Sequence, residues 1–316
     1  MPKVSVIIPT YNRSNLVKDA ICSVLAQNES DLEVIVVDDG STDGTCKVVE
    51  DLRDGRVNYF YKINGGAASA RNLGLSKCKG EYVAFLDSDD FWPENYLEVM
   101  ISHLENNGEF GAAYSPITLI HSDGTQIESY KKPDGNSGWL TVDLFKTSFV
   151  WIFAAVFHSS VWKDFYFDEL LTKVCEDSDA ILRLSIRTKF LFVPEIEAFH
   201  RISADSISSE VAAGYTRMLA LERFYFKLGG DKIVPAGIAR RRLSHSCRKV
   251  AEDHRSKMSK VAALELYKRA IQYWPCDLRL YIGLFKTLLL NSGKAKETNW
   301  EMPEPLCDPV GTNRFV

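Results

Sequence analysis

The chain has 316 residues, of which 46% are hydrophobic and 25% are charged, the composition of an ordinary globular protein. This length accommodates one large domain, or a catalytic domain with a smaller appendage. The 38 basic and 42 acidic residues give a formal charge of −4, which argues against a general nucleic-acid-binding function because that function needs a dominant basic surface.

Strand-like and helix-like segments alternate over the first ninety residues. Apolar, β-branched runs predict strands, and apolar residues at helical spacing predict the helices between them. The expected strands are 4–8, 33–37, 57–61 and 82–86, and the expected helices follow Ser14, open at Thr42 or Asp43, and span 67–77. Strands separated by single helices indicate an α/β fold with a mainly parallel sheet covered on both faces. In such sheets ligands bind beyond the carboxyl ends of the strands.

The later part of the chain changes in character. A strand is expected at 111–119, followed by a turn at 122–124 and a loop rich in polar residues, Gly and Pro at 131–137. Beyond 209 the strand signals fade, and helices are predicted at 211–228, 237–273 and 277–291. We therefore expect a catalytic domain at 1–208, a helical C-terminal region at 209–294 and a flexible tail at 295–316.

The strongest local signal is Asp87-Ser88-Asp89-Asp90, which follows the expected strand 82–86. Three carboxylates within four residues repel one another unless a cation or basic side chain neutralises them. Mn²⁺ and Mg²⁺ take such oxygen ligands together with substrate phosphates. The alternative is a solvated turn in which Asp90 caps the next helix. The position after a buried strand, level with the polar strand ends at 9–13 and 38–43, favours the metal interpretation.

Two further segments carry polar residues at the same expected edge. One carboxylate of Asp38-Asp39 could accept hydrogen bonds from a base edge or a ribose hydroxyl, although capping of the next helix is an equal alternative. The segment 64–72 is a helix entry rich in small residues, and its Arg71 could bind a phosphate or a carboxylate.

An acidic helix start follows at 176–179. The helix dipole alone favours acidic residues there, but a carboxylate at this place could also act as general base on an alcohol acceptor. Asp179 and Arg183 stand at i,i+4 and are interpreted as a structural ion pair. The six histidines show no ligand spacing, and His158 and His200 are expected to be structural.

Five segments taken together resemble the inverting glycosyltransferases of family 2, which have the GT-A fold. The segments are 5–13, 36–43, 70–74, 85–90 and 176–183, and the resemblance covers roughly residues 3–208. It implies a Rossmann-like, mainly parallel sheet flanked by helices. It also implies metal-dependent transfer of a sugar from a nucleotide sugar, with UDP as the expected nucleotide, to a hydroxyl of a glycan or lipid-linked oligosaccharide acceptor, as in polysaccharide biosynthesis.

The resemblance assigns a role to individual residues. The implied nucleotide-binding residues are Pro9, Thr10, Tyr11, Asp39, Arg71, Asp87 and Ser88. Asp39 would bind the base and Asp87 the ribose, Asp89 would coordinate Mn²⁺ or Mg²⁺, and Asp177 would be the catalytic base. Members often carry Arg-x-His after the last catalytic strand, but this chain has Arg201-Ile202-Ser203. Water or a phosphate oxygen would then replace the third protein ligand.

Two other functions stay open from the sequence. A nucleotidyltransferase also uses acidic clusters and magnesium, but no glycine-rich triphosphate loop stands near the N-terminus. A degenerate carbohydrate-binding protein is the non-catalytic alternative. Three aromatic residues of the variable middle, Trp139, Trp151 and Phe153, either stack on an acceptor sugar or pack in the core.

The sequence also bears on location and partners. Seven scattered cysteines have neither disulfide nor zinc spacing, and the N-terminus does not resemble a secretory signal, so a cytoplasmic location is expected. The apolar segment 278–290 is too short for a membrane span and carries two basic residues. Basic helices within 217–260 leave open a peripheral contact with the inner face of a membrane, or with another subunit in a homo-oligomer; a solvated helix face is the simpler interpretation.

Overall fold

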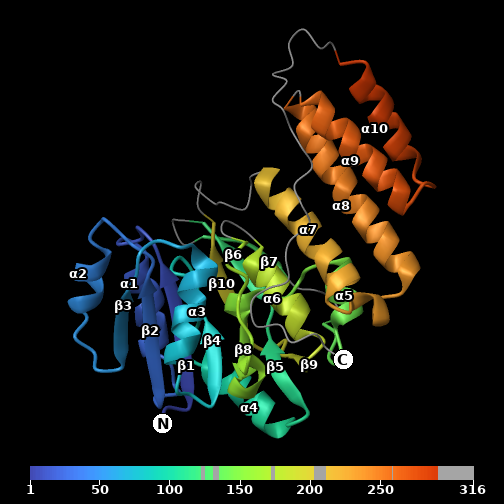
Figure 1. The fold of residues 1–316 in the computed structure, drawn as a ribbon. Helices are drawn as coiled ribbons and strands as arrows, with labels where there is room; N and C mark the ends of the chain where they lie inside the picture. Colours follow the sequence, from blue (N-terminus) through green and yellow to red (C-terminus); the bar gives the residue numbers. More distant parts are fainter. Residues whose placement is uncertain (122–124, 131–134, 172–174, 203–210, 258, 291–316) are drawn as a thin grey trace. The chain divides into compact units, whose positions relative to one another are not determined.

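The computed structural model describes residues 1–121, 125–130, 135–171, 175–202, 211–257 and 259–290, with only the backbone described at 127–130 and 211–213. These residues form two compact units (Figure 1). The sheet unit contains the described residues of 1–144 and 148–202, and the helical unit contains those of 145–147 and 211–290. The functional division into a catalytic domain, a helical region and a tail stays a prediction.

The sheet unit is built on a seven-stranded sheet of order β3-β2-β1-β4-β8-β5-β9. Its strands are β1 (Val4–Thr10), β2 (Leu32–Asp38), β3 (Val57–Tyr61), β4 (Tyr82–Phe85), β5 (Phe110–Tyr114), β8 (Ala155–His158) and β9 (Lys189–Phe192). All pairs are parallel except those of β8 with β4 and β5. The expected α/β fold with a mainly parallel sheet is therefore confirmed. A second sheet has the order β10-β6-β7, from β6 (Ile117–Ile120), β7 (Gln126–Tyr130) and β10 (Ala198–Arg201).

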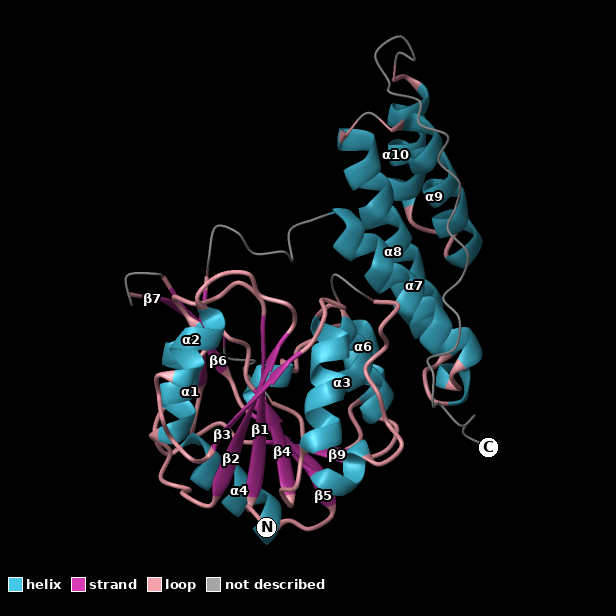
Figure 2. Cartoon of the chain, turned by 60° about the vertical axis from the view of Figure 1, so that its left-hand side comes forward, coloured by secondary structure: helices cyan, strands magenta, loops and turns pink. Residues whose placement is uncertain are grey.

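Helices cover both faces of the large sheet (Figure 2). The α-helices are α1 (Val17–Leu25), α2 (Thr45–Glu50), α3 (Ala67–Lys77), α4 (Tyr96–Asn106), α5 (Thr141–Lys146) and α6 (Glu176–Leu184), with short 3-10 turns η1 (Ile152–Ala154) and η2 (Ser159–Trp162). Every residue of β1 is buried because side chains of alternate residues meet helices on opposite faces. On one face Val6 and Ile8 share a core with α1 and α4. On the other, Gly74 lets α3 approach closely, since a Cβ there would lie 2.5 Å from Ile7.

Two elements differ from the sequence expectation. The strand expected at 111–119 is split into β5 and β6, which belong to different sheets. Pro116, which has no N–H to donate to a strand ladder, stands at the break. The helix expected at 237–273 is split into α8 (Ala236–Ser256) and α9 (Lys260–Tyr273). Val250 and Leu266 share one core because α9 returns along α8. The expected turn at 122–124, part of the expected loop at 131–137 and the tail from 295 lie outside the described residues.

The helical unit consists of α8 and α9 with α7 (Val211–Lys227), the short η4 (Gly230–Lys232) and α10 (Leu278–Leu288). Its core is formed by residues of all four long helices: Met218, Leu219, Cys247, Val250, Ala251, Ala263, Leu266, Tyr267, Ala270 and Leu280. Among the helices that the structure describes, none has both the length and the hydropathy of a membrane span.

Candidate active site

Three polar segments meet at the carboxyl edge of the sheet, as the sequence predicts. Thr10 at the end of β1 pairs with Asp38 at the end of β2, and the Thr10 carbonyl accepts the Asp39 N–H at 2.9 Å. On the other side of β1, the Leu86 N–H donates to the Ile7 carbonyl at 3.0 Å, which places the loop after β4 at the same edge. The segments beginning at Pro9, Asp38 and Asp87 are therefore neighbours because parallel strands end together.

The residues at and just after the end of β1 differ in their exposure. Pro9 lies within β1, and Thr10 is buried with a hydroxyl that has no hydrogen-bond partner among the described residues. Tyr11 is 49% exposed, and Asn12 adopts a positive φ of 50°. The exposed Tyr11 ring is thus available to a ligand at this edge of the sheet, whereas Thr10 is buried.

Asp39 is held by three donors from the loop before α3. Its Oδ1 accepts hydrogen bonds from Lys62 Nζ at 2.6 Å and Gly65 N at 2.9 Å, and its Oδ2 accepts one from Gly66 N at 2.7 Å. Gly66 has φ of 89°, a conformation that side chains rarely adopt. A carboxylate offers about four lone-pair directions. Asp39 is therefore fixed in place and keeps capacity for one further donor, such as the N–H of a base. Lys62 was not among the residues predicted from the sequence, although its position three residues before Gly65 is a local signal.

Arg71 joins two parts of the site, through partners that lie 16 and 105 residues from it in sequence. Its guanidinium is buried and donates to Asp87 Oδ1 at 2.7 Å and to Glu176 Oε1 at 2.6 Å. Although burial opposes the charge of Arg71, the two carboxylates raise its pKa. The sequence predicted Arg71 as a binder of a phosphate or carboxylate, and both partners seen here are carboxylates of the chain. Arg71 thereby connects the loop after β4 to the start of α6.

Asp177 lies next to Glu176 in the first turn of α6. Cys175, which precedes the helix, has a positive φ of 74°, so the chain turns sharply before α6 begins. Asp177 is partly exposed, and its Oδ1 accepts the Ser178 N–H at 2.7 Å. The expected ion pair between Asp179 and Arg183 is confirmed at 2.7 Å. Glu176, which the sequence argument did not separate from its acidic neighbours, is buried against Arg71, while Asp177 remains accessible.

Asp89 lies between Asp87 and Asp90 in the β4 loop, and its basic neighbour is more distant than those of the other two carboxylates. Burial, with the nearby charge of Asp87, raises the pKa of Asp89, and Arg13 lies 3.8 Å from its Oδ2. A divalent cation would stabilise the ionised form that burial disfavours. Within the described residues no group of three or more His, Cys, Asp or Glu side chains is placed to hold a metal. Asp89 fits a cation that takes one or two carboxylates and obtains its other ligands from substrate phosphates and water.

Asp90 does not cap the following helix, in contrast to the alternative weighed from the sequence. It is 1% exposed, and its Oδ1 accepts hydrogen bonds from His200 Nδ1 at 2.8 Å and Arg201 N at 3.1 Å. The N-cap residue of α4 is Asn95. Burial raises the pKa of Asp90 against the opposing effect of His200. Asp90 thus attaches β10 to the β4 loop, a pairing that needs the folded chain. Ser203, the residue in the place of the usual histidine, lies outside the described residues.

Two of the three aromatic residues named from the sequence, Trp151 and Phe153, lie beside His200. His200 stacks on Phe153 and Trp151, with ring centroids 5.3 Å and 5.9 Å apart. Phe153 is buried, which supports core packing, whereas Trp151 is 38% exposed and Trp139 is 59% exposed. The two tryptophans retain surface that a sugar ring could contact.

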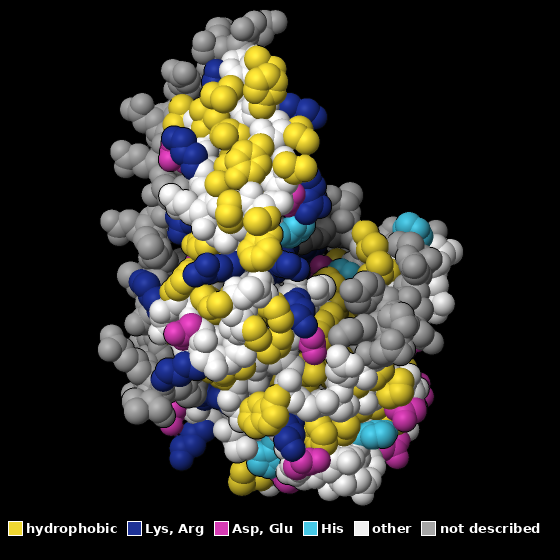
Figure 3. Space-filling view, turned by 90° about the vertical axis from the view of Figure 1, so that its right-hand side faces the viewer, with side chains coloured by type: hydrophobic (Ala, Val, Ile, Leu, Met, Phe, Trp, Pro, Cys, Tyr) yellow, Lys and Arg dark blue, Asp and Glu magenta, His cyan; other side chains and the backbone are white. Residues whose placement is uncertain are grey.

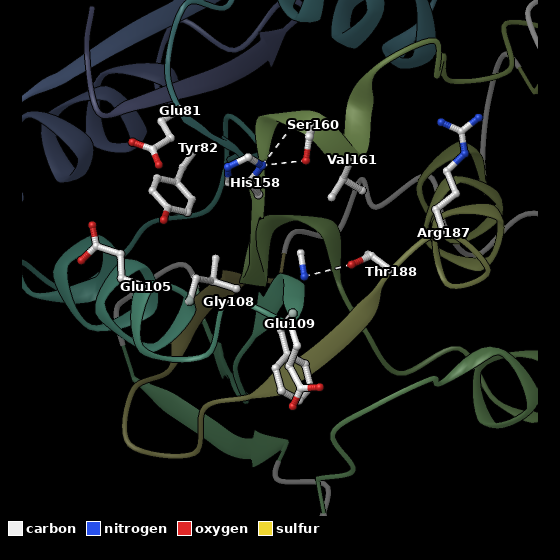
Figure 4. Close-up of a pocket in the computed structure, with 13 residues that line it drawn as sticks. Glu81, Tyr82, Glu105, Gly108, Glu109, His158, Ser160, Val161, Arg187 and Thr188 are labelled. Carbon is white, nitrogen blue, oxygen red and sulfur yellow. Dashed lines mark hydrogen bonds between the residues drawn. The ribbon is translucent and has the colours of Figure 1, made fainter.

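A cleft of about 620 Å³ lies at the opposite edge of the sheet and contains none of these residues. Figure 4 shows Tyr82, the first residue of β4, and His158, the last residue of β8, on its wall. Asp87 and Asp89 follow the other end of β4. The cleft is therefore separate from the candidate active site.

Comparisons with known proteins identify relatives and solved structures that this chain resembles. An uncharacterised glycosyltransferase of Rickettsia bellii is 43% identical over 144 residues, which are 45% of this chain and 20% of the relative. A protein of Bacillus subtilis described as a teichuronic acid biosynthesis glycosyltransferase, TuaG, is 40% identical over 133 residues, 41% of this chain and 52% of the relative. The matched region spans only about a fifth to about half of these relatives.

Solved structures share the fold. The structure of residues 1–349 of TarS from S. aureus in complex with UDP-GlcNAc has a TM-score of 0.63 at 18% identity, covering 90% of this chain and 88% of that one. The mannosyltransferase PcManGT from Pyrobaculum calidifontis, in complex with GDP-Man and Mn²⁺, has a TM-score of 0.55 at 21% identity, covering 91% and 87%.

The family profile described as Glycosyl transferase family 2 matches residues 5–165. This match covers half of the chain and includes the ends of β1, β2 and β4 with Asp39, Arg71 and Asp89. The chain belongs to glycosyl transferase family 2.

Proposed function

We propose that this chain transfers a sugar from a UDP-linked nucleotide sugar to a hydroxyl of a glycan or lipid-linked oligosaccharide, with inversion at the anomeric carbon. The observation that carries the proposal is the pair of ion pairs made by Arg71. They bring Asp87, on the side of the expected donor, and Glu176, next to the expected base, to one guanidinium. The solved neighbours that hold UDP-GlcNAc and GDP-Man support the class of donor.

The donor would bind along the edge formed by the ends of β1, β2 and β4. Asp39 accepts the N–H of the base with its remaining lone pair, Asp87 and Ser88 contact the ribose, and Tyr11 packs on the nucleoside above Pro9 and Thr10. Asp89 holds the divalent cation. Bound Mn²⁺ or Mg²⁺ would offset the negative charge that develops on the departing nucleoside diphosphate.

Asp177 serves as the general base. Its carboxylate takes the proton of the acceptor hydroxyl, and the hydroxyl oxygen forms a bond to the anomeric carbon while the bond from that carbon to the diphosphate oxygen breaks. Attack from the face opposite the diphosphate inverts the configuration. Glu176 and Arg71 hold the first turn of α6, so that Asp177 is presented toward the donor side.

The donor proposal is tested by thermal unfolding of the whole chain with UDP, GDP or dTDP, each with and without Mn²⁺. A ligand at 100 times its Kd stabilises the folded state by about 2.7 kcal/mol. We expect the largest rise in Tm with UDP and Mn²⁺ together. A chain that none of the three nucleotides stabilises in the presence of metal does not contain the proposed donor site. Release of pyrophosphate rather than free UDP during turnover would instead identify a nucleotidyltransferase.

The base is tested by Asp177→Asn, which removes the proton acceptor and keeps the shape of the side chain. Transfer should fall by roughly 10²- to 10⁴-fold, the usual contribution of a general base, while UDP affinity stays nearly unchanged. Glu195→Gln is the matched control, because Glu195 is an exposed carboxylate whose ion-pair contact, 3.7 Å to His103, lies outside the site. Near-normal turnover of Asp177→Asn would place the base elsewhere.

A further inference from the structure

Helix α10 of the helical unit has apolar side chains on two opposite faces. Its inner face carries Leu280 and Gly283, which are buried against the core. Gly283 permits this contact because a Cβ there would collide with Tyr267 of α9. The outer face carries large apolar side chains that are 43% to 75% exposed: Leu278, Tyr281, Ile282, Phe285, Leu288 and Leu289, the last just past the helix. Figure 3 shows hydrophobic side chains gathered on the surface of the helical unit.

The outer side chains form one continuous stripe. They recur three or four positions apart, the spacing at which residues lie on one face of a helix. Single exposed apolar residues are common on protein surfaces. Six large exposed apolar side chains on one face of the segment 278–289 indicate an interaction surface. The stability of the helical unit does not explain the stripe, because α10 already contributes Leu280 to the core on its other side.

The charged residues of the helix itself are both positive, and the acidic neighbour is Asp277 at its N-cap, which pairs with Arg279 at 2.8 Å. Arg279 and Lys286 are the charged residues of α10, they are exposed, and they stand seven residues apart, so both lie on the same flank of the stripe. Residues 211–290 contain 16 Lys and Arg against six Asp and Glu, although the whole chain has a formal charge of −4. The helical unit is therefore strongly cationic within an acidic protein.

We propose that the outer face of α10 docks onto the surface of an anionic lipid bilayer. The apolar stripe lies at the boundary between headgroups and acyl chains, and Arg279 and Lys286 contact headgroup phosphates on its flank. A second copy of the chain fits this surface less well, because a symmetric contact would bring two cationic units together. The docking does not depend on the proposed sugar transfer, and it is measured without donor or acceptor.

The test is co-sedimentation of the whole chain with vesicles of phosphatidylglycerol and phosphatidylcholine, compared with vesicles of phosphatidylcholine alone. We expect binding to the anionic vesicles that weakens as salt is added. Phe285→Asp should weaken this binding about tenfold or more. The variant loses the favourable free energy of moving one aromatic side chain from water into the bilayer. Phe226→Asp is the matched control, since Phe226 is 57% exposed on α7 and Phe285 is 62% exposed on α10. Lys286→Glu should reduce binding and its dependence on salt.

Several results would overturn the proposal: no preference for anionic vesicles, equal losses in the Phe285 and Phe226 variants, or a Phe285 variant that only converts a dimer to a monomer in sedimentation velocity. The melting temperature of each variant is measured alongside. If Phe285→Asp is unstable, Ile282→Asn, at a side chain that is 54% exposed, replaces it and must give the same loss of binding.

Discussion

Two acidic loops flank β1 at the carboxyl edge of the sheet, and the protein treats their carboxylates differently. At the end of β2, where the first of these loops begins, Asp38 accepts hydrogen bonds from the Ser41 N–H at 2.7 Å and the Tyr59 hydroxyl at 2.6 Å. Asp39 has three donors of its own. In the loop after β4, burial raises the pKa of Asp89, and one oxygen of the buried Asp90 has no hydrogen-bond partner among the described residues.

The difference shows how similar residues acquire different tasks. Carboxylates that are surrounded by internal donors are held in one orientation before any ligand arrives, so they suit recognition of a ligand by its shape. Carboxylates that are partly buried without enough donors favour the arrival of a positive charge. We therefore interpret the β2 loop as the preformed side of the donor site and the β4 loop as the side completed by the cation and the diphosphate.

The substitution with the largest expected effect is Asp89→Asn. It removes the carboxylate that we expect to hold the cation in the β4 loop, and with it the proposed difference between the two loops. Loss of the carboxylate should remove the Mn²⁺-dependent part of UDP binding and lower turnover by roughly 10²- to 10⁴-fold, equivalent to several kcal/mol of charge stabilisation. Titration calorimetry of UDP with and without Mn²⁺ measures the first effect. Asp51→Asn, at an exposed carboxylate after α2, is the control. Retention of the full metal dependence in Asp89→Asn would contradict this interpretation of the β4 loop.

Arg71 tests whether the β4 loop is tied to the catalytic helix. Arg71→Met leaves Glu176 buried without its partner and should destabilise the fold by about 3–5 kcal/mol. Arg71→Lys keeps the charge, but a single ammonium cannot span two carboxylates as the guanidinium does.

We expect Arg71→Lys to lower kcat about tenfold or more while the Kd of UDP changes less, because misplacement of α6 affects the base rather than the nucleoside. Steady-state kinetics and calorimetry separate the two quantities. Equal effects of Lys and Met on both stability and kcat would show that Arg71 supports only the fold.

The smallest expected effect concerns Asp43, at the end of the β2 loop. Although burial opposes it, hydrogen bonds from Thr45 and Ser14 lower the pKa of Asp43 from 3.8 to about 2. The folded pKa lies below the unfolded one, so this stabilisation is present above pH 4 and is lost as the pH falls through 2. Asp43→Asn should cost about 1 kcal/mol or less at pH 7, since the side chain is exposed, and should flatten the acid dependence between pH 4 and 2. Urea unfolding at a series of pH values measures both. A steeper acid loss in the variant than in the parent would refute the assignment.

Much of the sheet unit could be predicted from sequence because its signals are local. Strand β3 and helix α3 have the expected bounds. A run of β-branched and aromatic residues indicates the strand, and a segment that begins after two glycines indicates the helix. Each pattern can be recognised from a few consecutive residues. The prediction of one continuous strand at 111–119 was wrong, because hydrophobicity alone does not show that the chain changes from one sheet to the other at Pro116. The prediction of one long helix at 237–273 was wrong for a similar reason. Both α8 and α9 have apolar residues at helical spacing, and only the packing of one helix on the other requires a turn between them.

The sequence by itself determined that three acidic or polar segments would lie at one edge of a parallel sheet. The local pattern of apolar runs and helical spacing is enough to predict where each strand ends and where each helix follows. The tertiary structure alone decided the pairing of Arg71 with Glu176 and of Asp90 with His200, across 105 and 110 residues. These contacts depend on where distant strands and helices come to lie, and the charge and burial of each partner follow from that placement. The apolar outer stripe of α10 belongs to the same class, because only the packed structure shows which of its two faces is left exposed.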